Sequence, residues 1–162
     1  MATTVSDATM RVVIREEINL DGTDMGREVV RTITGINEFQ RFIKRCSVGV
    51  STVLATFKAT IEAPLLSNDW FDQKVKYIRI TNLDSTVSPT LLINSDAGSV
   101  LFKMRPSESF LMVGQEDPMS LTIPGGSAAV TFTALNYIGC YIPSSGGEGG
   151  VACDLEVVIA SA

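Results

Sequence analysis

Short runs in which apolar and polar residues alternate follow one another along most of this chain. Alternation with a period of two is typical of strands with one buried face. Clusters of glycine, proline, asparagine, aspartate and serine separate the runs about every 8–12 residues, as turns do in antiparallel sandwiches and barrels. The runs cover residues 9–19, 28–34, 48–57, 74–82, 89–94, 99–104, 108–113, 118–123, 128–134, 136–142 and 151–160. They predict an all-β chain that forms an antiparallel β-sandwich resembling a jelly roll.

Residues 36–46 are the one segment in which a helix competes with a strand. Phe39, Phe42, Ile43 and Cys46 are spaced as the apolar face of an amphipathic helix requires. Strand-like runs border the segment on both sides, and no helix cap is obvious before Ile36. These neighbours favour a strand, with the helix as the alternative.

The first two runs flank LDGTDMGR, in which an Asp-Gly pair and a second glycine indicate a hairpin with a slightly long loop. The preceding segment MATTVSDATM is polar and lacks the basic and apolar regions of a signal peptide. We interpret residues 1–12 as an N-terminal arm that becomes ordered on assembly. A length of 162 residues suits one domain, which we assign to residues 13–162.

The distribution of charge excludes some classes of partner. The first 60 residues are nearly balanced, but after Arg105 the chain has six acidic residues and no lysine or arginine. Nucleic-acid binding depends on cations that neutralise phosphates, so nucleic acid is a poor partner. No apolar run approaches the roughly 18 residues of a membrane helix, so no membrane partner is expected.

The side chains that usually carry catalysis are scarce. The chain has no histidine, which removes the commonest general base and metal ligand. The glycine-rich SSGGEGG segment has a glutamate where a phosphate-binding loop needs a cation. Three cysteines, Cys46, Cys140 and Cys153, form no CxxC pair, and their odd number favours free thiols. We expect no enzymatic activity, no cofactor and no metal.

Aromatic residues leave a carbohydrate-binding module as one alternative, because such modules are often small sandwiches without catalytic groups. Tyr77, Tyr137 and Tyr141 are candidates for a sugar platform, although core packing explains them more simply. Trp70 and Phe71 lie together in a segment interpreted as a loop, 62–72. That pair is predicted either to cover one end of the sandwich or to anchor in a partner's pocket.

Several segments resemble small virion-structural proteins of tailed marine bacteriophages. The run from Tyr77 to Asp84, YIRITNLD, is similar to a Y-[IL]-R-I-T-N-L-D segment of those proteins. VVIREEINLDGTD, TGINEFQR and MRPSESFLM are also similar, the last with Ser107 in place of a glycine. The resemblance covers residues 9–113 and brings no catalytic residues. It implies a capsid decoration or cement protein of the virion, assembled in the host cytoplasm, with attachment to a tail or fibre as the alternative.

Partner contacts are expected in the charged N-terminal third. The partners implied are the major capsid protein or other virion subunits, together with further copies of this chain. A solvated surface of mixed charge explains the same residues equally well. The residues proposed for partner contact are Arg11, Arg15, Arg27, Arg31, Trp70 and Phe71.

Overall fold

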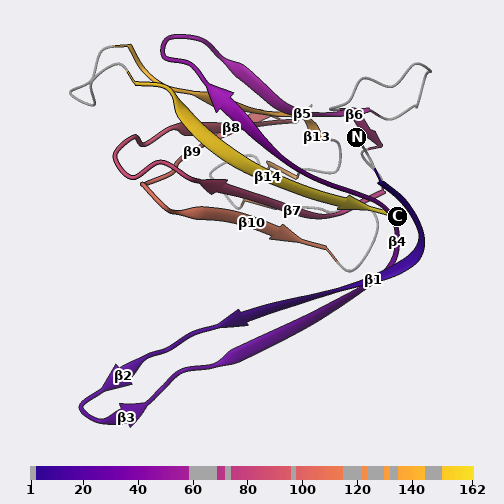
Figure 1. Ribbon diagram of the computed structural model, residues 1–162, viewed down its shortest axis with the longest axis vertical. Coiled ribbons are helices and arrows are strands. Elements are labelled where there is room, and N and C mark those ends of the chain that lie inside the picture. The colour runs from indigo at the N-terminus through magenta and orange to yellow at the C-terminus, as the bar shows by residue number, and fades with distance from the viewer. Residues whose placement is uncertain are drawn as a thin grey trace.

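The computed structural model describes residues 3–58, 69–71, 74–95, 98–114, 122–123, 130–131, 135–144 and 151–162. These residues form β-strands and no α-helix, which confirms the predicted all-β class (Figure 1). No helix in the described chain could therefore cross a membrane. The strands are β1 (Thr3–Arg15), β2 (Asn19–Leu20), β3 (Thr23–Asp24), β4 (Glu28–Cys46), β5 (Thr52–Lys58), β6 (Asp69–Phe71), β7 (Val75–Asn82), β8 (Thr90–Ser95), β9 (Gly98–Lys103), β10 (Ser109–Val113), β11 (Thr122–Ile123), β12 (Val130–Thr131), β13 (Leu135–Tyr141) and β14 (Cys153–Ser161).

Ten of these strands form two five-stranded sheets. Sheet A has the order β1-β4-β14-β7-β10, and sheet B has the order β6-β5-β13-β8-β9. All pairs are antiparallel except β5 with β6. The chain changes sheet between β4 and β5, β6 and β7, β7 and β8, β9 and β10, β10 and β13, and β13 and β14, with the separate β11-β12 pair lying between β10 and β13 in the sequence. Strands far apart in the sequence therefore become neighbours.

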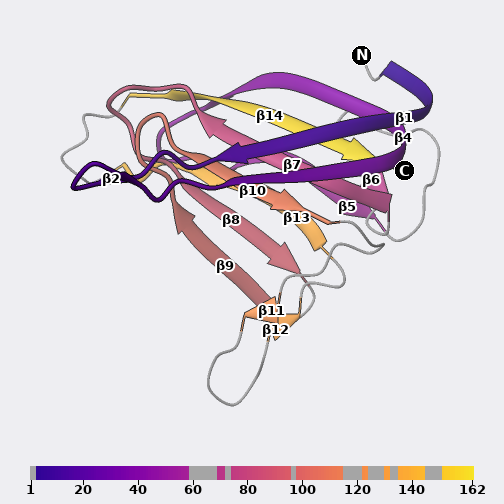
Figure 2. The same cartoon turned by 90° about the horizontal axis from the view of Figure 1, so that it is seen from below.

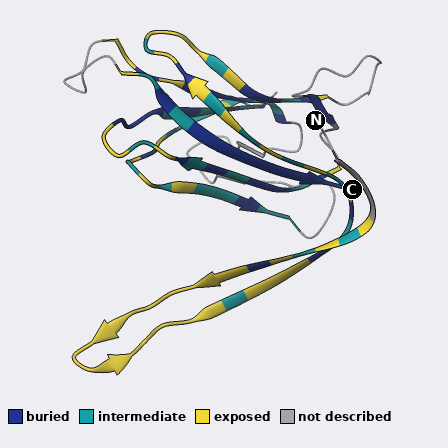
Figure 3. Cartoon of the chain, viewed as in Figure 1, coloured by how far each residue is buried: buried dark blue, intermediate teal, exposed yellow. Residues whose placement is uncertain are grey.

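One hydrophobic cluster joins the two sheets. It combines Ile78, Ile80 and Leu155 of sheet A with Leu91 and Ile138 of sheet B, all fully buried. These residues occupy alternate positions on their strands, as a period of two requires. Figure 3 shows the buried positions concentrated in this body. The strands predicted at 74–82, 89–94, 99–104 and 108–113 are confirmed as β7, β8, β9 and β10, with ends within two residues.

Residues 36–46 belong to β4, so the strand prediction is confirmed and the helical alternative is wrong. Phe42 and Cys46 lie on the same side of the strand as Ile36, whereas Phe39 and Ile43 are exposed on the other side. The four residues that suggested a helix therefore lie on two opposite faces of one strand. Pairing with β14 along Cys46 to Glu38 supplies hydrogen bonds that the local pattern could not reveal.

Strands β1 and β4 continue beyond β14 as a two-stranded hairpin that runs away from the body (Figure 1). Register shifts around Ala8, together with positive φ angles at Asp7 and Gly35, mark the bend where it leaves the sheet. The predicted boundary between an arm at 1–12 and a domain at 13–162 falls inside β1, and the division itself stays a prediction. From Thr3 onward the N-terminal segment pairs with β4.

Candidate functional site

The projecting hairpin is the first candidate site. From here on, the arm means residues 13–30 of this hairpin and not the segment 1–12. At its end Asp21 and Gly22 both have positive φ angles and connect Leu20 to Thr23. This is the two-residue turn that an Asp-Gly pair favours, so the predicted hairpin is confirmed with a tighter turn than expected. The root is held by a small cluster in which Val12 and Ile33 of the hairpin pack with Tyr77 and Val158 of sheet A.

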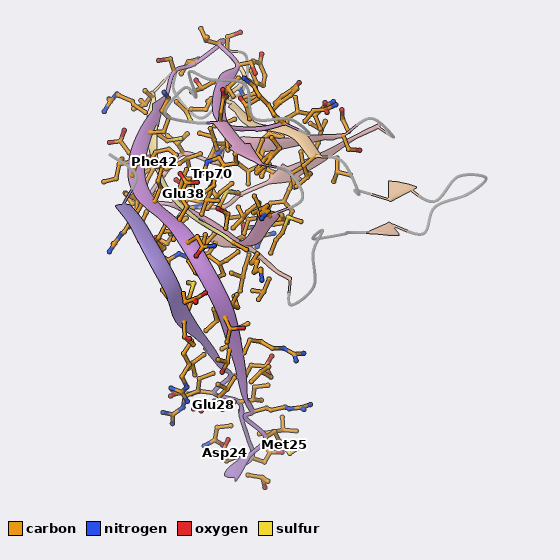
Figure 4. The ribbon with its side chains drawn as sticks, turned by 90° about the vertical axis from the view of Figure 1, so that its right-hand side faces the viewer. Asp24, Met25, Glu28, Glu38, Phe42 and Trp70 are labelled. Carbon is orange, nitrogen blue, oxygen red and sulfur yellow. The ribbon has the colours of Figure 1, made fainter. Side chains whose placement is uncertain are left out.

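Beyond this root the arm is exposed to solvent (Figure 3). Its exposed apolar side chains are Val13, Ile14, Ile18, Leu20, Met25 and Val30. The largest exposed fractions occur toward the tip, 64% for Leu20 and 59% for Met25. Figure 4 places Asp24, Met25 and Glu28 at the far end of the arm, with Trp70 in the body.

The arm has no third strand along residues 13–30 within the described chain. A two-stranded hairpin alone is only marginally stable in water, and its outer edges carry unpaired backbone groups. A close approach of backbone near the tip depends on Gly26, where an added Cβ would lie 2.3 Å from the carbonyl oxygen of Glu16. The arrangement suits a segment that becomes covered when a partner binds.

The four arginines proposed for partner contact all lie on the hairpin and are exposed. Arg11 lies 4.0 Å from Glu28, and Arg15 lies 3.4 Å from Glu17. These surface ion pairs reduce the positive charge available to a partner and contribute little to stability. Contact of Arg11, Arg15, Arg27 and Arg31 with a partner remains a prediction.

Trp70 is buried to 2% exposure inside the body, so the prediction that it anchors in a partner's pocket is wrong. It lies on the short strand β6, which pairs in parallel with β5, and it belongs to the main hydrophobic cluster. The large apolar area of tryptophan explains this placement. The loop predicted at 62–72 thus contains a strand at its end. The side chain of Phe71 lies outside the described residues.

The three tyrosines proposed as a sugar platform differ in their exposure to solvent. Tyr77 is buried at 4% exposure, Tyr137 is half-buried, and Tyr141 is 40% exposed. Residues that stack on a sugar must be open to solvent on one side, so Tyr141 is the one clearly exposed member of the set.

The segment from Tyr77 to Asp84 is a structural element of the body. Asn82, with 1% exposure, donates from Nδ2 to the carbonyl oxygens of Val87 at 2.8 Å and Arg105 at 3.0 Å. Its Oδ1 accepts a hydrogen bond from the backbone N–H of Asp84. The Asp84 carboxylate accepts from the backbone N–H groups of Thr86 and Val87, and these bonds lower its pKa. The two side chains organise a turn.

The MRPSESFLM segment contains a second specified turn. The backbone N–H of Glu108 donates to the carbonyl oxygen of Arg105, with Pro106 and Ser107 between them. Ser107 has a φ of 61°, a conformation that favours glycine. A serine therefore stands at a position where the backbone conformation is strained for any residue but glycine.

A charge network lies on the outer face of sheet A. Glu156 is 8% exposed. Its carboxylate accepts hydrogen bonds from Arg41 Nε at 2.7 Å and from Arg79 Nη2 at 2.5 Å. The hydrogen bond from Arg41, together with the positive charges of Arg41 and Arg79, lowers the pKa of Glu156 despite its burial. The network joins β4, β14 and β7 in one sheet.

We expect this network to make stability depend on pH. Because the folded-state pKa of Glu156 is lower than its unfolded value of about 4.3, its contribution is present above that value and is lost as pH falls below it. Glu156→Gln should destabilise the protein at pH 7 by about 1–2 kcal/mol, since both arginines are partly exposed. Thermal unfolding at pH 7 and pH 3 measures this, and Asp154→Asn, on a more exposed ion pair, is the control. An equal loss at both pH values would contradict the assignment.

The second candidate site is a cluster of all three cysteines. Cys46 and Cys153 are register partners on β4 and β14, and Cys140 reaches them from β13 of the other sheet. All three are free and buried, with their sulfur atoms within 4.8 Å of one another. The predicted free thiols are confirmed in this structure. The contact between Cys140 and Cys153 joins the two sheets.

The thiols influence one another's acidity. Hydrogen bonds from Cys140 and Cys46 lower the pKa of Cys153 to about 4. Hydrogen bonds with Cys153 and Cys46, followed by burial, raise the pKa of Cys140. Three thiols at this separation can stay reduced, form one disulfide or ligate a metal ion. Sequence spacing did not reveal the cluster because the three residues meet only through pairing between distant strands.

Comparison with known proteins adds no identification. The chain matches no protein-family model, no curated protein and no solved structure. The arm and the cysteine cluster are therefore interpreted from their own geometry.

Proposed function

We propose that this chain is a non-enzymatic structural protein of a bacteriophage virion, a decoration or cement subunit that binds the outer capsid shell. We further propose that its two sheets form a jelly-roll sandwich. The strand orders β4-β14-β7-β10 and β5-β13-β8-β9 support this architecture, since, apart from the β8-β9 hairpin, successive strands of these two sets alternate between the sheets. The body then acts as a rigid platform for the arm.

The observation that carries the proposal is the exposed apolar arm. Six large apolar side chains are exposed along residues 13–30, and the body is packed without them. Exposed apolar groups gathered on one element mark an interaction surface more often than isolated ones do. The unpaired backbone edges add hydrogen-bonding groups that an extended segment of a partner can meet.

In the contact between the hairpin and the shell, the charged residues contribute more to selectivity than to affinity. Residues 11–31 contain four arginines and five carboxylates, so the hairpin has no strong net charge to attract an acidic shell. Burial of Leu20, Met25 and their neighbours would supply most of the binding energy, because apolar burial contributes about 25 cal/mol per Å².

Repetition on a symmetric shell strengthens such a contact. Subunits that also contact one another, or bind at several points, gain effective concentration, so each individual interface can be modest. This is the reason for proposing that copies of this chain associate with one another as well as with the shell.

The proposal is tested on the phage that encodes the chain. Mass spectrometry of purified particles should detect the protein, and the purified protein should co-sediment with empty capsids but not with isolated tails. Binding to tails alone would favour the tail-attachment role. Absence of the protein from purified particles would overturn the virion assignment.

A further inference from the structure

The cysteine cluster has a geometry that core packing alone does not require. The chain contains three cysteines, and strands β4, β13 and β14 bring all of them to one point. Their exposed fractions are 0%, 0% and 1% for Cys46, Cys140 and Cys153. Free cysteine often packs as a small apolar residue, but such packing leaves the sulfur atoms free to point in different directions.

We propose that Cys46, Cys140 and Cys153 form a three-coordinate site for a soft, thiophilic metal ion, Cu(I). A metal ion about 2.3 Å from each of three sulfur atoms in a plane holds them about 4 Å apart. The separations here are within 4.8 Å, so only a small inward movement of the side chains is needed. This site is independent of the arm and of assembly.

The donor set selects against the commoner metal ions. Calcium and magnesium require oxygen ligands, and structural zinc requires four ligands. The chain has no histidine or fourth cysteine, and no carboxylate joins the three sulfur atoms in the part of the chain that is described. Burial of the sulfur atoms also limits water as a fourth ligand. Soft thiolate ligands favour Cu(I).

A surface recess lies near the ends of β4 and β14 that carry Cys46 and Cys153. It has a volume of about 280 Å³ and lies over the residues that flank Cys46 and Cys153 in the sequence. Its carboxylates can attract a cation, although Arg45 offsets part of their charge through a 3.5 Å contact with Asp154. The residues that line the recess are Ile43, Arg45, Leu83, Asp84, Val151, Ala152 and Asp154.

Binding is a ligand exchange without electron transfer. Each thiol that becomes a ligand gives its proton to solvent as its sulfur lone pair forms the bond to copper. The metal remains Cu(I), and the three sulfur atoms remain in the thiol oxidation state. Metal affinity should therefore weaken as pH falls.

The test is an anaerobic titration of the full reduced chain with Cu(I) in the presence of a competing Cu(I) chelator. We expect one Cu(I) per chain, a raised melting temperature and a copper X-ray absorption spectrum with three sulfur neighbours. Cys140→Ala should reduce Cu(I) affinity at least about 100-fold if it removes one ligand of the set. Ser47→Ala, which changes an exposed residue beside Cys46, is the matched control.

The spectrum of the wild-type chain keeps the test decisive if Cys140→Ala fails to fold. Two sulfur neighbours, or none, would overturn the three-coordinate site. So would complete loss of Cu(I) to the chelator, or tighter binding of Zn(II) than of Cu(I). The three cysteines would then be core residues.

Discussion

Replacing residues 13–30 by an Asn-Gly turn is expected to weaken binding to capsids at least about 100-fold while the body stays folded. Val12 and Arg31 are register partners, so a two-residue turn can join them directly. The change removes six exposed apolar side chains. Burial of even three of them, each already half-covered, would contribute about 3 kcal/mol to binding, which corresponds to about two orders of magnitude in affinity.

The measurement pairs co-sedimentation with capsids and thermal unfolding of the isolated protein. The root cluster of Val12, Ile33, Tyr77 and Val158 is retained, so the melting temperature should change by only a few degrees, as about 1 kcal/mol would cause. Undiminished capsid binding would contradict the role of the arm. It would indicate contact through another surface, such as the loops of the body.

A milder pair of variants separates contact from folding. Leu20→Ser combined with Met25→Ser leaves the backbone of the arm intact but removes its two most exposed apolar side chains near the tip. Leu101→Ser, on the exposed face of β9 and also highly exposed at 70%, is the matched control. Loss of binding in the first variant and not in the second would assign the contact to the arm.

Asn82→Ala is expected to destabilise the protein by about 3 kcal/mol, because two carbonyl oxygens lose their donor and one backbone N–H loses its acceptor. For a chain of this size that loss corresponds to a fall of about 10 °C in melting temperature. Circular dichroism during heating measures it directly. Capsid binding of the protein that remains folded should be unchanged.

Asn94→Ala provides the comparison. Asn94 is a half-buried strand asparagine whose Nδ2 donates to Ser99 Oγ at 2.8 Å. Its replacement should cost less than about 1 kcal/mol, since water can reach the groups left behind. If Asn82→Ala is equally mild but impairs binding to particles, the segment from Tyr77 to Asp84 acts in recognition and not in folding.

The amino-acid sequence by itself determined most strands of the body and several turns, because both depend on neighbouring residues. A period of two marked β7 through β10, and Asp21-Gly22 marked a hairpin, although its turn is tighter than the slightly long loop that was expected. The apolar run of β14 indicated a strand but not its central place, which results from pairing with β4 and β7. The helical spacing in residues 36–46 left a helix open as the alternative, because local periodicity contains no information on strand pairing.

Only the tertiary structure decided where these elements lie relative to one another. It buried Trp70 through packing of β6 on β5, although the surrounding residues suggested an exposed loop. It extended the hairpin beyond the sheet, where β14 ends and no third strand covers the described arm. It also brought Cys46, Cys140 and Cys153 together from two sheets. Each outcome depends on contacts between residues far apart in the sequence, and the free energy of those contacts is absent from any local pattern.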